Sequence, residues 1–195
     1  MNLPNRLTVL RIILTFIFMF LLFSEGLLAK IMALVVFTLA CVSDFFDGYL
    51  ARKYDLITDL GKLLDPLADK ILVLSAYLAF LEMRIITAWM VAIIILRELI
   101  VSGVRFLATS KGKILAAAKA GKHKTVSQMV SIFIILAYII IKEICTGFNF
   151  WNAKIEFWAK FAIYLLMLIT VALTVISGIF YLKENRGIFK NAKNS

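Results

Sequence analysis

The chain has 195 residues, 63% of them hydrophobic, with a mean hydropathy of +0.95 and a net charge of +10. Soluble domains carry about 45–50% apolar residues, so this composition excludes an ordinary soluble globular protein and indicates a membrane protein. The basic residues flank apolar runs without interleaved aromatic platforms, so we expect no nucleic-acid binding. The length predicts a single domain, residues 1–195.

Apolar segments long enough to cross a bilayer follow one another along the chain, since each crossing needs about 20 residues. In chain order we expect transmembrane helices at residues 7–24, 29–48, 65–82, 85–108, 125–146 and 156–182. The pattern therefore predicts an all-α, polytopic membrane protein with six transmembrane helices. We expect Pro66 in a first helical turn, where its missing N–H costs no hydrogen bond. The first segment is not expected to be a cleaved signal peptide, because Arg11 lies inside it and no small-residue cleavage site follows.

The basic residues are divided unequally between the two sides of such a protein. One side carries fifteen Lys or Arg, the other carries five, and Lys70 and Arg97 lie within the apolar segments. The richer side comprises residues 1–11, 49–64, 105–124 and 183–195. The positive-inside rule then predicts a cell-membrane protein with both termini in the cytoplasm.

Four aspartates lie within or beside the second and third apolar segments: Asp44, Asp47, Asp65 and Asp69. On helices, spacings of three and four residues place each pair on one face, with Cβ atoms about 5–6 Å apart. Crowded carboxylates repel one another, and Mg²⁺ or Mn²⁺ with oxygen ligands would compensate them. The sequence therefore predicts a divalent-metal site, with room for two ions.

The residues beside these aspartates suit a diphosphate. Gly48 and Gly61 would let a ligand approach the backbone closely, and Arg52 would take up negative charge. A single aspartate could instead cap a helix end. For the set of four this alternative fails, because Asp44 and Asp47 follow a long apolar run, at the unfavourable end of a helix dipole.

The stretch Asp44-Phe-Phe-Asp47-Gly48-Tyr-Leu-Ala51-Arg52, followed after eight residues by Gly61-Lys-Leu-Leu-Asp65-Pro-Leu-Ala-Asp69, resembles the signature of the CDP-alcohol phosphatidyltransferases. The resemblance implies a membrane enzyme, usually a homodimer, that transfers a phosphatidyl group from CDP-diacylglycerol to an alcohol and releases CMP. It implies that Asp44, Asp47, Asp65 and Asp69 hold metal and that Asp69 is the general base. The CDP-lipid-binding residues it implies are Asn5, Thr8, Gly48, Arg52, Thr58 and Gly61. An equally good interpretation of Asn5 and Thr8 is that they begin a helix and contact no ligand.

A group of basic residues further along the chain predicts which kind of alcohol accepts the phosphatidyl group. Arg97 and Arg105 are eight residues apart on one expected helix, and Lys122 and Lys124 open the next. An arginine buried within an apolar segment, as expected for Arg97, needs a partner for its charge. Glu98 is expected to face elsewhere, because adjacent helical residues point in different directions. A phosphate group on the acceptor would be a suitable partner. The surrounding stretches, and the start of the chain, resemble bacterial family members that use sn-glycerol 3-phosphate. We therefore expect a cytoplasm-facing polar cavity that binds this acceptor.

Other functions remain open from the sequence alone. A related transferase could use inositol phosphate, phosphatidylglycerol or serine, although the paired arginines favour a phosphorylated acceptor. A divalent-cation transporter would also place acids in a membrane, but more naturally near the middle of the bilayer on a continuous polar path.

Overall fold

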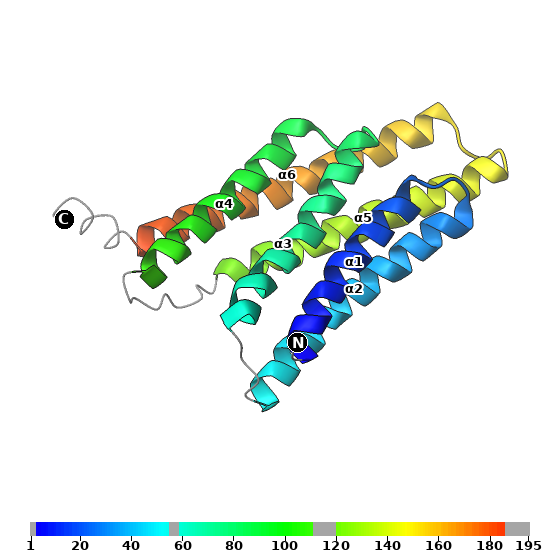
Figure 1. Ribbon diagram of the computed structural model, residues 1–195. Helices are drawn as coiled ribbons and strands as arrows, with labels where there is room; N and C mark the ends of the chain where they lie inside the picture. The colour runs from blue at the N-terminus through cyan, green and yellow to red at the C-terminus, as the bar shows by residue number, and fades with distance from the viewer. Residues whose placement is uncertain (1–2, 55–58, 111–119, 186–195) are drawn as a thin grey trace.

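The computed structural model describes the backbone of residues 3–54, 59–110 and 120–185, and the side chains of residues 9–43, 70–106, 108 and 124–185. Over these residues the protein consists of six helices and no strand. The helices are α1 (Leu3–Phe23), α2 (Leu27–Tyr54), α3 (Asp59–Glu82), α4 (Ala88–Ser110), α5 (Ala120–Gly147) and α6 (Ala153–Glu184). They form an elongated bundle in which successive helices run in opposite directions (Figure 1). The expected all-α fold with six helices is confirmed.

The helix ends differ most from expectation in the segment that carries the aspartates. Helix α2 continues to Tyr54, beyond the expected end at residue 48, and α3 begins at Asp59 rather than at residue 65. Polar residues that end an apolar segment do not end a helix, because backbone hydrogen bonding continues through them. Helix α4 begins later than expected, at Ala88, because the preceding turn includes Arg84 with φ 56°.

The expected place of Pro66 was wrong. Because α3 begins at Asp59, Pro66 is its eighth residue and lies in the helix interior. Proline has no N–H, so the carbonyl of Lys62 lacks its usual partner four residues later. The missing bond spans Lys62 to Pro66 and so includes Asp65, in the part of α3 that carries the signature residues.

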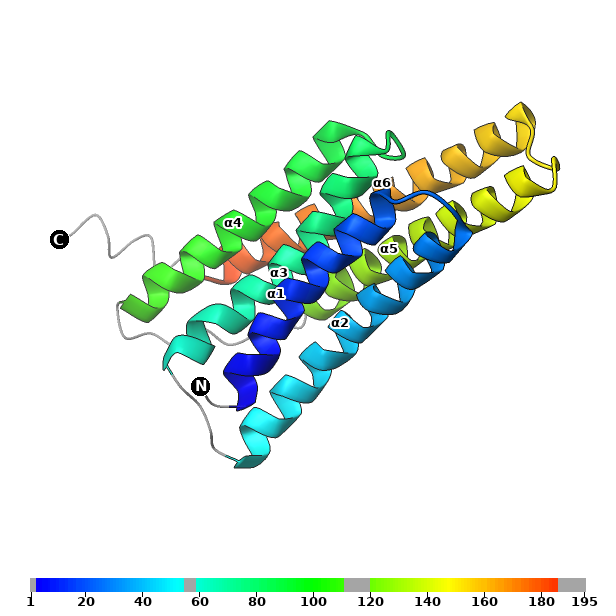
Figure 2. The ribbon, with the colours of Figure 1, turned by 45° about the vertical axis from the view of Figure 1, so that its right-hand side comes forward.

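Three short turns connect the helices at one end of the bundle (Figures 1 and 2). Gly26 adopts φ +92°, a conformation that favours glycine after a helix end. The Lys30 ammonium donates to the carbonyls of Leu22 at 2.7 Å and Ser24 at 2.8 Å, which satisfies the end of α1. Asn152 caps α6, its side-chain oxygen accepting from the Ile155 N–H at 2.9 Å. The aspartate-bearing ends of α2 and α3 therefore lie at the opposite end, where α1 begins and α6 ends.

The bundle has an apolar core and an apolar outer surface. Phe18 packs on Phe37 with ring centroids 5.2 Å apart, and Phe37 meets Phe133 edge-on at 5.5 Å. By contrast, Phe16 and Phe20 expose 68% and 73% of their surface. Exposed apolar residues at this density are typical of a surface covered by lipid rather than water.

Length and composition identify membrane-crossing candidates among the described residues. The segments Lys124–Gly147 and Ala153–Glu184 are both long and apolar enough to cross a bilayer. Within the described residues, Val9–Phe23 and Leu27–Ser43 are shorter apolar helical segments.

Candidate active site

The four aspartates of the signature lie on two helices. Asp44 and Asp47 belong to α2, and Asp65 and Asp69 belong to α3, so the spacings of three and four residues place each pair on one helical face. Figures 1 and 2 show the end of α2 and the start of α3 at the same end of the bundle. The side chains of all four aspartates lie outside the described residues.

The type of ligand atom fits a hard divalent ion, because carboxylate oxygens are what Mg²⁺ and Mn²⁺ bind. Among the described side chains, no group of three or more His, Cys, Asp or Glu could hold a metal ion. Asp44, Asp47, Asp65 and Asp69, whose side chains were not part of that set, are candidate ligands on the sequence prediction alone.

A buried arginine lies level with the first of these aspartates. Helices α1 and α2 are antiparallel, and Phe18 packs against Phe37. Arg11 lies seven residues, about two helical turns, before Phe18 on the same face of α1. Asp44 lies the same number of residues after Phe37 on the same face of α2. The Arg11 side chain is fully buried, at 0% exposure. The bundle therefore places a buried cation at the level of the carboxylate-bearing segment.

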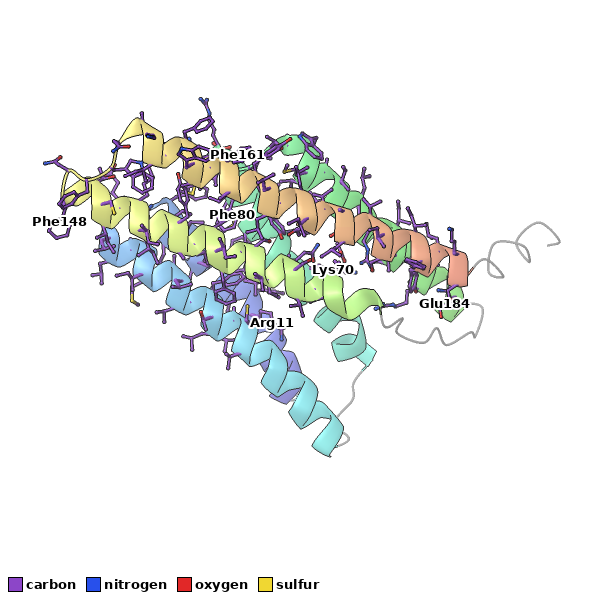
Figure 3. The ribbon with its side chains drawn as sticks, turned by 180° about the vertical axis from the view of Figure 1, so that it is seen from behind. Arg11, Lys70, Phe80, Phe148, Phe161 and Glu184 are labelled. Carbon is purple, nitrogen blue, oxygen red and sulfur yellow. The ribbon has the colours of Figure 1, made fainter. Side chains whose placement is uncertain are left out.

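Next to this segment, polar side chains from four helices form one hydrogen-bonded cluster, which we call the Glu98 network. Its members are Lys70 of α3, Arg97, Glu98 and Ser102 of α4, Lys124 of α5 and Ser177 of α6. Lys70 directly follows Asp69 in sequence, and Figure 3 shows it within the bundle, between Phe80 and Glu184 along its length.

Glu98 is the centre of this network. Its Oε1 accepts from Arg97 Nη1 at 3.2 Å and from the ammonium of Lys124. Arg97 also donates through Nη2 to the Ser177 hydroxyl at 2.9 Å. The side chains of Arg97, Glu98 and Lys124 expose only 12%, 11% and 8% of their surface. Charges this buried are stable only when paired, so removing Glu98 would leave two cations without their carboxylate.

The expectation that Glu98 faces away from Arg97 was wrong. Adjacent helical residues do point their Cβ atoms in different directions, but the long side chains of arginine and glutamate reach back toward each other. Arg97 therefore has a protein partner for its charge, and its burial alone does not require a substrate phosphate.

The other sequence-predicted site residues divide into two groups. Arg105 is exposed on α4, about 12 Å from Arg97 along the helix axis, and Lys124 is buried against Glu98. The side chains of the remaining predicted residues lie outside the described part of the chain. These are Asn5, Thr8, Gly48, Arg52, Thr58, Gly61 and Lys122.

Sequence reasoning missed four members of the network: Glu98, which was expected to face elsewhere, and Lys70, Ser102 and Ser177. The available signal was Lys70, an ionisable residue inside an apolar segment, which needs a partner there. Serine within an apolar helix gives almost no signal, because its hydroxyl commonly bonds its own backbone, as Ser127 does with the Lys124 carbonyl at 2.8 Å.

A six-helix bundle with an apolar exterior is typical of an integral membrane protein. The model of the CDP-alcohol phosphatidyltransferase family matches residues 1–184. The chain therefore belongs to this family and is a phosphatidyltransferase of phospholipid biosynthesis. The match favours a transferase over a cation transporter.

Several curated relatives are similar over most of their length. A CDP-diacylglycerol–glycerol-3-phosphate 3-phosphatidyltransferase of Bacillus subtilis (strain 168) is 36% identical, covering 94% of this chain and 95% of its own. Proteins of the same name from Rickettsia typhi and Mycoplasma pneumoniae are 34% and 32% identical. The alignments cover 96% and 98% of this chain, and 99% and 89% of those relatives.

Proposed function

We propose that the protein transfers the phosphatidyl group of CDP-diacylglycerol to sn-glycerol 3-phosphate, giving phosphatidylglycerophosphate and CMP for anionic phospholipid synthesis. The observation that carries this proposal is the similarity, over nearly the whole chain, to relatives named for that reaction. The basic residues along α4 and α5 support it, because a phosphorylated acceptor needs positive charge.

Asp44, Asp47, Asp65 and Asp69 would hold one or two Mg²⁺ or Mn²⁺ ions. When bound, the metal would neutralise the diphosphate of the CDP-lipid and stabilise CMP as the leaving group. Asp69 accepts the proton of the attacking hydroxyl, since a carboxylate next to a positioned hydroxyl is a suitable general base. Proton removal makes the acceptor oxygen nucleophilic as its bond to the lipid phosphorus forms.

The nucleotide end of the CDP-lipid is assigned to residues of the signature and of α1. Gly48 and Gly61 leave room for the diphosphate, Arg52 binds its oxygens, and Thr58 contacts the nucleotide. Asn5 and Thr8, near the start of α1, are assigned to the cytidine end.

The acceptor phosphate is assigned to Arg97, Arg105, Lys122 and Lys124. Arg105 is the exposed arginine of α4, and Arg97 and Lys124 are held by Glu98. We further propose that six helices cross the cell membrane, with both termini in the cytoplasm and the polar cavity open to that side, and that the enzyme is a homodimer. The excess of basic residues at the end of the bundle where α1 begins and α6 ends supports this orientation.

An acceptor panel tests the proposal. Purified protein is given CDP-diacylglycerol with glycerol 3-phosphate, inositol phosphate, serine or phosphatidylglycerol, and CMP release is followed. We expect CMP release with glycerol 3-phosphate and little with the others. Preferential use of serine or phosphatidylglycerol would contradict the phosphorylated acceptor, and preferential use of inositol phosphate would identify the alternative acceptor.

Replacing Arg105 by alanine is expected to raise the KM for glycerol 3-phosphate about tenfold or more, the loss of roughly one charge-assisted contact. The KM for CDP-diacylglycerol should change little. Arg84→Ala, which removes an arginine from a turn at the other end of the bundle, is the matched control. Equal increases in both constants for Arg105→Ala would place this residue outside the acceptor pocket.

A further inference from the structure

The Glu98 carboxylate is shared by cations from two different helices. Arg97 lies on α4 and Lys124 on α5, and both donate to the same oxygen, Glu98 Oε1. Without this carboxylate the two cations would repel each other in a poorly solvated interior. Their positions therefore depend on Glu98.

Arg97 is also held from the side of α6. Its Nη2 donates to Ser177, which is 4% exposed. The next residue, Gly178, faces the arginine stem: a Cβ at this position would lie 3.1 Å from Arg97 Cγ and 3.8 Å from Nε. The absence of a side chain at Gly178 gives the arginine room, and the Ser177 hydroxyl fixes the direction of its guanidinium.

The same network ties α4 to the helix that carries Asp69. Lys70 donates to the Ser102 hydroxyl, and Ser102 donates to the Glu98 carbonyl at 2.6 Å. The main chain of Glu98 is thereby connected to the residue that follows Asp69. The helix that carries the proposed base is therefore hydrogen-bonded, through Lys70, to the helix that carries Arg97.

We propose that Glu98 is a positioning residue for the acceptor: its carboxylate, with the Ser177 hydroxyl, holds Arg97 and Lys124 in place to bind the acceptor phosphate. This inference rests on the proposed function. A pocket whose cations are already ordered loses less side-chain freedom when the ligand binds, so its affinity for the phosphate is higher. Glu98 itself touches neither substrate nor metal in this scheme.

The test compares KM values in the full-length protein, reconstituted in lipid nanodiscs, by CMP release. Glu98→Gln is expected to raise the KM for glycerol 3-phosphate about tenfold or more and to leave that for CDP-diacylglycerol within about twofold. Ser177→Ala is expected to raise the same constant about three- to tenfold, since it removes one hydrogen bond to a charged group. Glu98→Asp, which keeps the charge, is expected to recover part of the loss.

The chain offers a matched control for each variant. Glu156 is also shared by two lysines, Lys142 at 3.1 Å and Lys160 at 2.9 Å, at the other end of the bundle. The Thr174 hydroxyl is also buried in α6 but bonds the Thr170 carbonyl of its own helix, at 2.7 Å. Glu156→Gln and Thr174→Ala should leave the KM for glycerol 3-phosphate unchanged.

Glu98→Gln removes the carboxylate that Arg97 and Lys124 share and can prevent folding. Ser177→Ala therefore provides the decisive result if the glutamine variant is not recovered. An unchanged KM for glycerol 3-phosphate in Ser177→Ala would then overturn the proposal. In a folded Glu98→Gln protein, an unchanged constant, equal changes for both substrates, or a lowered KM for glycerol 3-phosphate would do the same. The last result would mean that Glu98 occupies the place of the phosphate. Failure of the wild-type protein to use glycerol 3-phosphate would instead overturn the proposed function.

Discussion

Replacement of Asp69 by asparagine is expected to abolish turnover, with kcat falling by at least about 100-fold, the lower bound for losing a general base. The amide is nearly isosteric with the carboxylate but cannot accept the proton of the attacking hydroxyl. The backbone should be little affected, because Asp69 lies in the interior of α3, well inside both of its ends at Asp59 and Glu82. The measurement is CMP release at saturating concentrations of both substrates.

The same variant must still bind the CDP-lipid for this interpretation to hold. Binding of CDP-diacylglycerol to Asp69→Asn is measured by titration, and we expect it to remain detectable. Asp59→Asn, at the first residue of α3 and outside the fixed positions of the signature, is the control and should retain activity. Substantial turnover by Asp69→Asn would exclude Asp69 as the base.

Removal of divalent ions is expected to stop the reaction completely. Chelation by EDTA would leave crowded carboxylates and a diphosphate without compensating charge, which is unfavourable both for substrate binding and for release of CMP. CMP release should return when Mg²⁺ or Mn²⁺ is added in excess over the chelator. Full activity after exhaustive chelation would contradict the metal site.

The overall architecture could be predicted from the sequence because it depends on composition and periodicity. Long apolar runs give helices, and short polar interruptions give turns, such as the one at Gly26. Helices α2 and α3 extend beyond the expected spans, because those spans were predicted from hydropathy. Helix α2 ends at Tyr54 and α3 begins at Asp59, both in polar sequence. Helical hydrogen bonding continues there although the residues are no longer apolar.

A candidate site can be predicted from the sequence where its chemistry leaves a local pattern, and the aspartate site stays such a prediction. The aspartate spacings and their neighbouring glycines are visible within 26 residues, from Asp44 to Asp69. The Glu98 network has no such pattern, because it joins residues far apart in sequence, such as Arg97 and Ser177. Its arrangement depends on how α4, α5 and α6 pack, and on how far long side chains reach, which residue spacing alone does not determine.

The central claim is that α2 and α3 bring four carboxylates together around divalent cations. Its most direct test is the anomalous scattering of Mn²⁺ in crystals of the full-length protein grown with this ion. We expect one or two strong peaks, each within about 2.0–2.6 Å of carboxylate oxygens from both helices, the range for hard divalent ions. Aspartate side chains that face separate surfaces, with no manganese between them, would contradict the account.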